Sequence, residues 1–311
     1  MHKLYSIGGQ MSTANTTPPQ EECGFLPLVE QTTGMVIFFL YNMWYNISNK
    51  FKSKSCYRLD RSLSSSYNNI SYQISLYKFF IIFFKGAIMK RTKLADRMLP
   101  DYTRGEEIMN MVTHIVGGAI GVVALTLCVI FAAIHGNVWG IVTSAIYGTS
   151  MITMFTISSV YHGLKPTLGK KVMQVIDHCT IYFLIAGTYT VIVLSAIRPI
   201  YPWLGWGLFA FEWAMVALAA TFTAIDHKRY GAFSMVCYIG MGWAVIPFWR
   251  QTLEVLTLPG FLLLLGGGIA YTIGSVLYGI GKKKKWMHSV FHIFVVLGAV
   301  LQFFSVLLYA V

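Results

Sequence analysis

Long apolar segments dominate the chain from about residue 111 onward. Each has roughly 20 residues or more, which is enough for a helix to cross the ~30 Å hydrocarbon core of a bilayer. The segments are continuous rather than alternating, so membrane-spanning strands are not expected. The spans are 112–134, 138–161, 174–197, 205–225, 232–250, 259–279 and 288–311. The sequence therefore predicts an all-α polytopic membrane protein with seven transmembrane helices.

The composition of the chain agrees with this class. Apolar residues make up 56% of the sequence and charged residues 12%, and the mean hydropathy is +0.60. A soluble domain usually has about 25% charged residues, and here too few polar side chains remain to cover a soluble surface. A soluble enzyme, a disordered chain and a fibrous protein are thereby excluded. The five cysteines lack CxxC spacing, so neither a disulfide framework nor a thiolate metal site is indicated.

Residues 1–88 differ in composition from residues 89–311. They hold six of the eight asparagines, and their two apolar patches, 35–45 and 79–89, are each about half the length of a membrane helix. We therefore expect a poorly ordered N-terminal extension over 1–88 and a seven-helix transmembrane domain over 89–311. Two explanations of the extension stay open: an over-extended start with Met89 as the natural initiator, and a genuine cytoplasmic extension.

Lysine and arginine lie almost entirely on one side of the predicted bundle. That side receives the segment before the first span and the connections between spans two and three, four and five, and six and seven. Among the residues that flank the spans, only Arg198 and Arg250 fall on the other side. Because Lys and Arg mark the cytoplasmic face, the N-terminus is expected inside and the C-terminus outside. The formal net charge of +12 is then mainly a topology signal, so membrane lipids are expected partners and nucleic acid is not.

Polar side chains within the spans gather at the predicted cytoplasmic ends. Polar residues inside a membrane are costly and are therefore functional candidates. They are Glu107, Asn110 and His114 on one face at the start of the first span, Ser158 and His162 at the end of the second, Asp177 at the start of the third, and His288 and His292 at the start of the seventh. These spans alternate in direction, yet the groups share one depth, whereas chance would scatter them over both faces.

Two of these histidines have the spacing of a metal chelate. His288 and His292 are one helical turn apart, so both imidazoles can aim a nitrogen at one point. A third ligand from another helix would complete a catalytic zinc arrangement. Alternatively, such histidines form hydrogen bonds at the membrane boundary, and Asn110 and His114 form hydrogen bonds between helices.

The seven spans and these motifs together resemble the hemolysin III family, the bacterial branch of the progestin and adipoQ receptor superfamily. The resemblance covers about residues 95–311. It implies a Zn²⁺ ion held near the cytoplasmic side by His162, His288 and His292, with Ser158 and Asp177 close to the zinc-bound water. It also implies a multi-pass protein of the cell (plasma) membrane.

The resemblance further implies a lipid substrate, and an inner-leaflet site favours a lipid amide or ester. In such a hydrolase Asp177 would act as general base and then acid, and Ser158 would orient water or stabilise an oxyanion. Glu107, Asn110 and His114 would support the ligands or the packing. Two other functions remain open: a pore-forming, cytolytic role, and a non-catalytic role in membrane-lipid homeostasis or sensing with structural zinc.

Overall fold

The computed structural model describes residues 91–281 and 284–311, and these residues form helices and no strand. The long helices are α3 (Arg104–Ile134), α4 (Val138–Gly163), α5 (Leu168–Val191), α6 (Pro202–Asp226), α7 (Gly231–Gly242), α8 (Trp249–Gly281) and α9 (Met287–Tyr309). Short helices are η1 (Leu94–Asp96), η2 (Ile192–Ile197), which continues α5, and η3 (Ile246–Phe248). The extension expected over residues 1–88 lies outside the described residues and stays a prediction.

Local sequence signals explain where several helices begin. Before α3, the Thr103 hydroxyl accepts a hydrogen bond from the Glu106 N–H at 3.3 Å, and the Glu106 carboxylate accepts one from the Thr103 N–H at 2.9 Å. This reciprocal capping box satisfies backbone donors that have no partner within the helix. Asn137 caps α4 by accepting from the Gly140 N–H at 2.8 Å. Pro202 is the first residue of α6, where its missing N–H removes no helical hydrogen bond.

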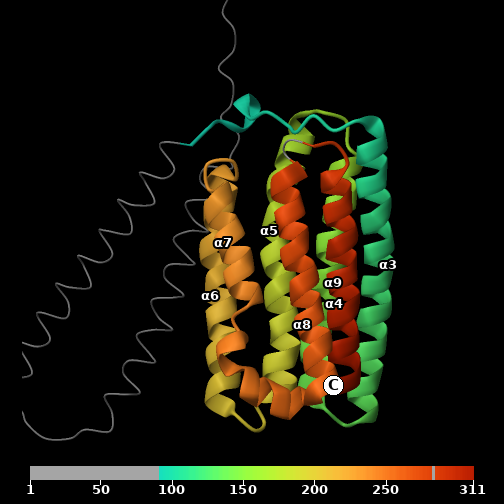
Figure 1. Ribbon diagram of the computed structural model, residues 1–311, viewed down its shortest axis with the longest axis vertical. Helices are drawn as coiled ribbons and strands as arrows, with labels where there is room; N and C mark the ends of the chain where they lie inside the picture. The colour runs from blue at the N-terminus through green and yellow to red at the C-terminus, as the bar shows by residue number, and fades with distance from the viewer. Residues whose placement is uncertain (1–90, 282–283) are drawn as a thin grey trace, which may run out of the picture. The chain divides into compact units, whose positions relative to one another are not determined.

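The described chain contains six helical segments that are long and apolar enough to cross a membrane. The polytopic all-α class is confirmed, but the expected count of seven is not. One segment, Gly231–Gly281, has 51 residues and includes both expected spans 232–250 and 259–279. The cause is local, because α7 has only 12 residues and runs on through a turn and η3 into α8, whereas a helix needs about 20 residues to span alone. In Figure 1 the chain descends through α7 and returns upward through α8.

A break near the beginning of α8 separates these two directions. Thr257 has φ 58° and ψ 170°, a non-helical backbone conformation normally adopted by glycine. Pro259 follows two residues later, and a proline both lacks the N–H of a helical hydrogen bond and restricts the residue before it. The helix therefore cannot continue straight through this point.

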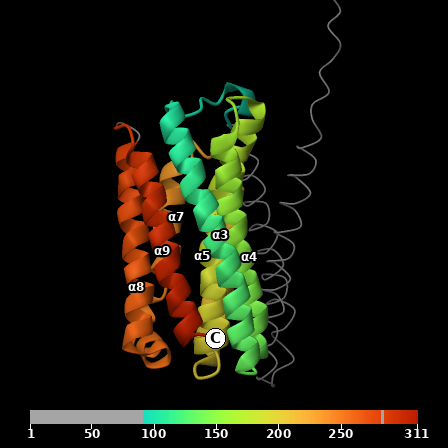
Figure 2. The ribbon, with the colours of Figure 1, turned by 90° about the vertical axis from the view of Figure 1, so that its right-hand side faces the viewer.

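The helices that carry most of the predicted polar groups are neighbours. Helix α3 contacts both α4 and α9, and Figure 2 shows α3 in front with α9 on one side and α4 on the other. Glycines bring α3 close to α4: an added Cβ at Gly117 would lie 2.5 Å from Phe155 Cδ1, and one at Gly121 would lie 3.2 Å from the Ile152 nitrogen. Such small residues are typical of close helix packing in membranes.

Candidate metal centre

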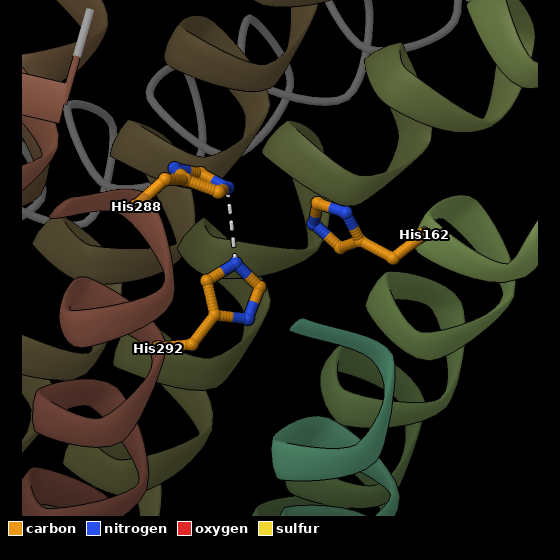
Figure 3. A group of neighbouring side chains, drawn as sticks. All are labelled: His162, His288 and His292. Carbon is orange, nitrogen blue, oxygen red and sulfur yellow. Dashed lines mark hydrogen bonds between the residues drawn. The ribbon is translucent and has the colours of Figure 1, made fainter. Parts of the chain in front are cut away.

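Three histidines from two helices lie together at the upper end of the bundle in Figure 1, where α3, α5 and α9 begin. His162 lies in the last turn of α4, and His288 and His292 lie on one face in the first turns of α9. One nitrogen of each ring lies within 4.8 Å of the other two, and Figure 3 shows the three rings turned toward one another. The structure thus brings together the three residues that the sequence analysis assigned to a metal.

The three imidazoles are buried, with exposed fractions of 3% for His162, 9% for His288 and 2% for His292. Nε2 of His288 and Nε2 of His292 are 3.0 Å apart, as the dashed line in Figure 3 marks. Two such nitrogens attract each other only when one carries a proton or a cation lies near both. Three imidazoles converging in this way can supply the three protein ligands of a catalytic zinc site.

A carboxylate orients His162 toward the other two rings. Glu107 Oε2 lies 2.6 Å from His162 Nδ1, and Glu107 Oε1 accepts a hydrogen bond from the buried Lys170 ammonium at 2.6 Å. With its Nδ1 proton donated to Glu107, His162 presents the lone pair of Nε2. Within the described chain that buried Nε2 has no hydrogen-bond partner. A carboxylate that fixes a histidine tautomer is the usual support of a metal ligand, so these residues fit a metal ion.

The other two residues of α3 that the sequence singled out, Asn110 and His114, also lie close to the histidines. Asn110 is buried, and its Nδ2 lies 3.5 Å from His162 Nδ1. The His114 ring packs on His292 with 3.9 Å between ring centroids, and it lies nearly perpendicular to the Phe155 ring with 5.0 Å between centroids. Both residues therefore lie next to the three-histidine group rather than in it.

Ser158 and Asp177 line the cavity into which His288 and His292 also project. Ser158 is buried one turn before His162 on α4. Asp177 is partly buried on α5, and its Oδ2 lies 3.7 Å from His178 Nδ1. The structure therefore places the two residues predicted to act on the substrate beside the same cavity as His288 and His292.

This cavity has a volume of 1030 Å³ and extends away from the histidines along several helices. On α9 its lining runs from His288 through Val295 to Gln302, a stretch of about 21 Å at 1.5 Å per residue. On α5 it runs from Gln174 to Tyr189, a similar length. The lining is largely apolar, with polar side chains around the histidines and also at Thr188 and Gln302 far from them.

Sequence reasoning missed three residues around the histidines: Tyr102, Glu106 and Lys170. Tyr102 stacks on His288 with 4.8 Å between centroids and an interplanar angle of 15°. Burial raises the pKa of Tyr102, and nearby groups including Glu107 act in the same direction, so its hydroxyl stays protonated. Only Glu106 carries a sequence signal, because Thr103-x2-Glu106 is a capping-box pattern. Lys170 looks like an ordinary positive flank of a span, and nothing local marks Tyr102.

These features define a polytopic helical membrane protein with a buried three-histidine group. The family model described as "Haemolysin-III related" matches residues 102–303. The chain therefore belongs to the haemolysin III family, as the sequence motifs had indicated.

Curated relatives support the same assignment. "Hemolysin-3" of Bacillus cereus is 37% identical over 204 residues, covering 66% of this chain and 91% of the relative. "Hemolysin-3 homolog" of Bacillus subtilis (strain 168) is 37% identical over 210 residues, covering 68% and 97%. The human "Monocyte to macrophage differentiation factor" is 25% identical over 179 residues, covering 54% and 70%, which fits the wider superfamily. No solved structure shows a significant match.

Proposed function

We propose that the protein is a zinc-dependent hydrolase of a lipid amide or ester, with its upper end at the cytoplasmic face of the cell membrane. The observation that carries the proposal is that two of the three converging buried histidines, His288 and His292, line a long, largely apolar cavity. His162, His288 and His292 would hold the ion. When bound, Zn²⁺ activates water for attack at neutral pH and polarises a carbonyl group.

The side chains beside the histidines supply proton transfer and orientation. Asp177 accepts a proton from the attacking water as the new carbon–oxygen bond forms. It then returns that proton to the departing nitrogen or oxygen as the amide or ester bond breaks, so the products are a carboxylic acid and an amine or alcohol. Ser158 donates a hydrogen bond to the negative charge that develops on the carbonyl oxygen.

The surroundings of the cavity support a lipid rather than a water-soluble substrate. Ile239 of α7 and Val276 of α8 both line the cavity, and the two residues are 37% and 58% exposed. Apolar surface of this kind suits contact with lipid rather than water. Between these two helices a lipid chain would enter the cavity from the bilayer.

The test combines metal analysis with lipid hydrolysis by the purified protein. We expect about one zinc per chain and release of free fatty acid from long-chain N-acyl amides or acyl esters in detergent micelles. Asp177→Asn should retain zinc and lose at least about 100-fold in rate, whereas Glu254→Gln, a change at an exposed carboxylate of α8 that does not line the cavity, should keep the wild-type rate. The double variant His288→Ala/His292→Ala should lose the zinc. Wild-type protein without zinc, or without hydrolysis of any of these lipids, contradicts the proposal.

The names of the two Bacillus relatives favour a second candidate, a haemolytic protein. Purified protein should then lyse red blood cells, and the lysis should survive Asp177→Asn. Lysis that disappears together with hydrolysis would instead assign membrane damage to the enzyme activity.

A further inference from the structure

Residues 91–103, here called the strap, cross the upper end of the bundle before α3 begins (Figure 1). The strap lies over the cavity, because residues 98–102 all contribute to the cavity lining together with His288 and His292. The two ends of the strap are held by hydrogen bonds, whereas Tyr102 contacts the histidines through its ring.

The first end is anchored to the end of α6. Arg97 is 4% exposed, and its Nη2 donates a hydrogen bond to the Ile225 carbonyl at 2.7 Å. The Thr92 N–H donates to Asp226 Oδ2 at 2.9 Å. Lys171 of α5 also donates to the Ala95 carbonyl.

The second end is anchored both to α3 and to the residue directly before α9, the helix that carries His288 and His292. Thr103 and Glu106 form the capping box of α3. The other oxygen of Glu106 accepts a hydrogen bond at 2.6 Å from the N–H of Trp286, the residue directly before α9. The buried Glu106 carboxylate thus holds this end of the strap beside His288.

Between its anchored ends the strap contacts the histidines through the ring of Tyr102. Residues 98–101 make no backbone hydrogen bond with other described residues, and Pro100 has no N–H to donate. Tyr102 provides the contact with the histidines: its ring lies parallel to His288 at 4.8 Å and 6.0 Å from the His162 ring. Stacked aromatic rings fix each other's orientation.

We propose that Tyr102 is a positioning residue that holds the plane of His288 and closes the upper end of the cavity, so that an ion can leave the three histidines only when the middle of the strap lifts. The metal-exchange part of this inference rests on the proposed zinc site. The ring, rather than the hydroxyl, carries the role, because the stacking contact belongs to the ring.

The first test is the rate at which zinc moves from the zinc-loaded, full-length protein to an excess of chelator. Tyr102→Phe keeps the ring and should release zinc within twofold of the wild-type rate. Tyr102→Ala and Tyr102→Leu should release it faster by about tenfold or more, the scale seen when support of a metal ligand is removed. Tyr230→Ala is the matched control, because the Tyr230 ring packs at a tilt against Phe222 of α6, with 5.0 Å between centroids, and its loss should not alter release.

The second test does not depend on a metal. In metal-free protein, diethyl pyrocarbonate should modify the peptide containing His288 faster in Tyr102→Ala than in wild type or Tyr102→Phe, as measured by mass spectrometry. Absence of zinc from the wild type would overturn the proposed function alone, and the modification rates would still decide whether Tyr102 covers His288. Equal rates in wild type and Tyr102→Ala, or a Tyr102→Phe variant as fast as Tyr102→Ala, overturn the role of the ring.

Discussion

Glu107 divides its two oxygens between His162 on α4 and Lys170 on α5, and so links three helices at one residue. The imidazole contact fixes which nitrogen of His162 faces the other histidines, while the ammonium contact balances the carboxylate charge. A buried ion pair of this kind adds little net stability but specifies geometry. At this position the ion pair serves to fix the orientation of the His162 ring.

Replacing Glu107 by Gln should therefore weaken zinc binding without removing a ligand. We expect an affinity loss of about 10–100-fold, the usual effect of removing support for a metal ligand, measured by competition with a chelator. Glu212→Gln is the control: Glu212 is fully buried on α6, and its replacement should leave zinc affinity unchanged. Equal affinity for wild type and Glu107→Gln would contradict the orienting role.

His227, between α6 and α7, predicts a pH dependence of stability. Burial, followed by the neighbouring His178 and Arg97, lowers the pKa of His227 to about 4. An unfolded histidine titrates near 6.5, so the unfolded chain binds this proton first as the pH falls. The free energy of unfolding should therefore decrease between about pH 6.5 and 4, by at most about 3 kcal/mol.

Melting curves in detergent at several pH values test this effect. His227→Gln should flatten the loss of melting temperature across that window, whereas His135→Gln, a change at an exposed residue, should not. If the melting temperatures of the wild type and of His227→Gln change in parallel with pH, the predicted contribution of His227 is wrong.

At the scale of elements, the close packing of α3 against α4 depends on the absence of a side chain at Gly117. Gly117→Ala would place a Cβ 2.5 Å from the ring of Phe155, which is fully buried, so the ring or the helix must shift. The free energy of unfolding should fall by about 1–3 kcal/mol, seen as a lower melting temperature in detergent. Gly207→Ala meets nothing within 4 Å on α6 and should be neutral or slightly stabilising; similar melting temperatures for both variants would refute the packing argument.

The elements that the sequence predicted well are those with long, uniform apolar segments. Helices α3, α4, α6 and α9 begin or end within a few residues of capping, proline or charge signals. The region 231–281 was predicted less well: the break at Thr257 lies between the two expected spans, but α7 already ends at Gly242 and the first turns of α8 come before the break. Hydropathy measures solubility in lipid, and it does not report backbone direction.

The candidate site was likewise predictable only in part. His162, His288 and His292 could be grouped because spacing and topology put them at one depth. Tyr102 could not, since its place depends on how the strap crosses the bundle. Lys170 could not either, because its carboxylate partner is on another helix and its charge already had a topological explanation.

At the scale of the whole molecule, the charge asymmetry predicts the orientation. A reporter that works only outside the cell should be active when it is fused after Val311, because the C-terminus is expected there. A reporter that works only in the cytoplasm should be inactive at the same position. Replacing the four lysines 282–285 by Gln should weaken this preference, since they flank the last described helix. A C-terminal reporter that is active only in the cytoplasm would reverse the predicted topology.

The distance in sequence between the histidines has a consequence for biosynthesis. His162 is made early, while His288 and His292 lie on α9, after every other described helix. Chains are synthesised from the N-terminus, so an incomplete chain offers a single histidine of the three. A metal ion held there would bind only after α9 had been inserted against α3 and α4, and its capture would mark the moment when these three helices have come together.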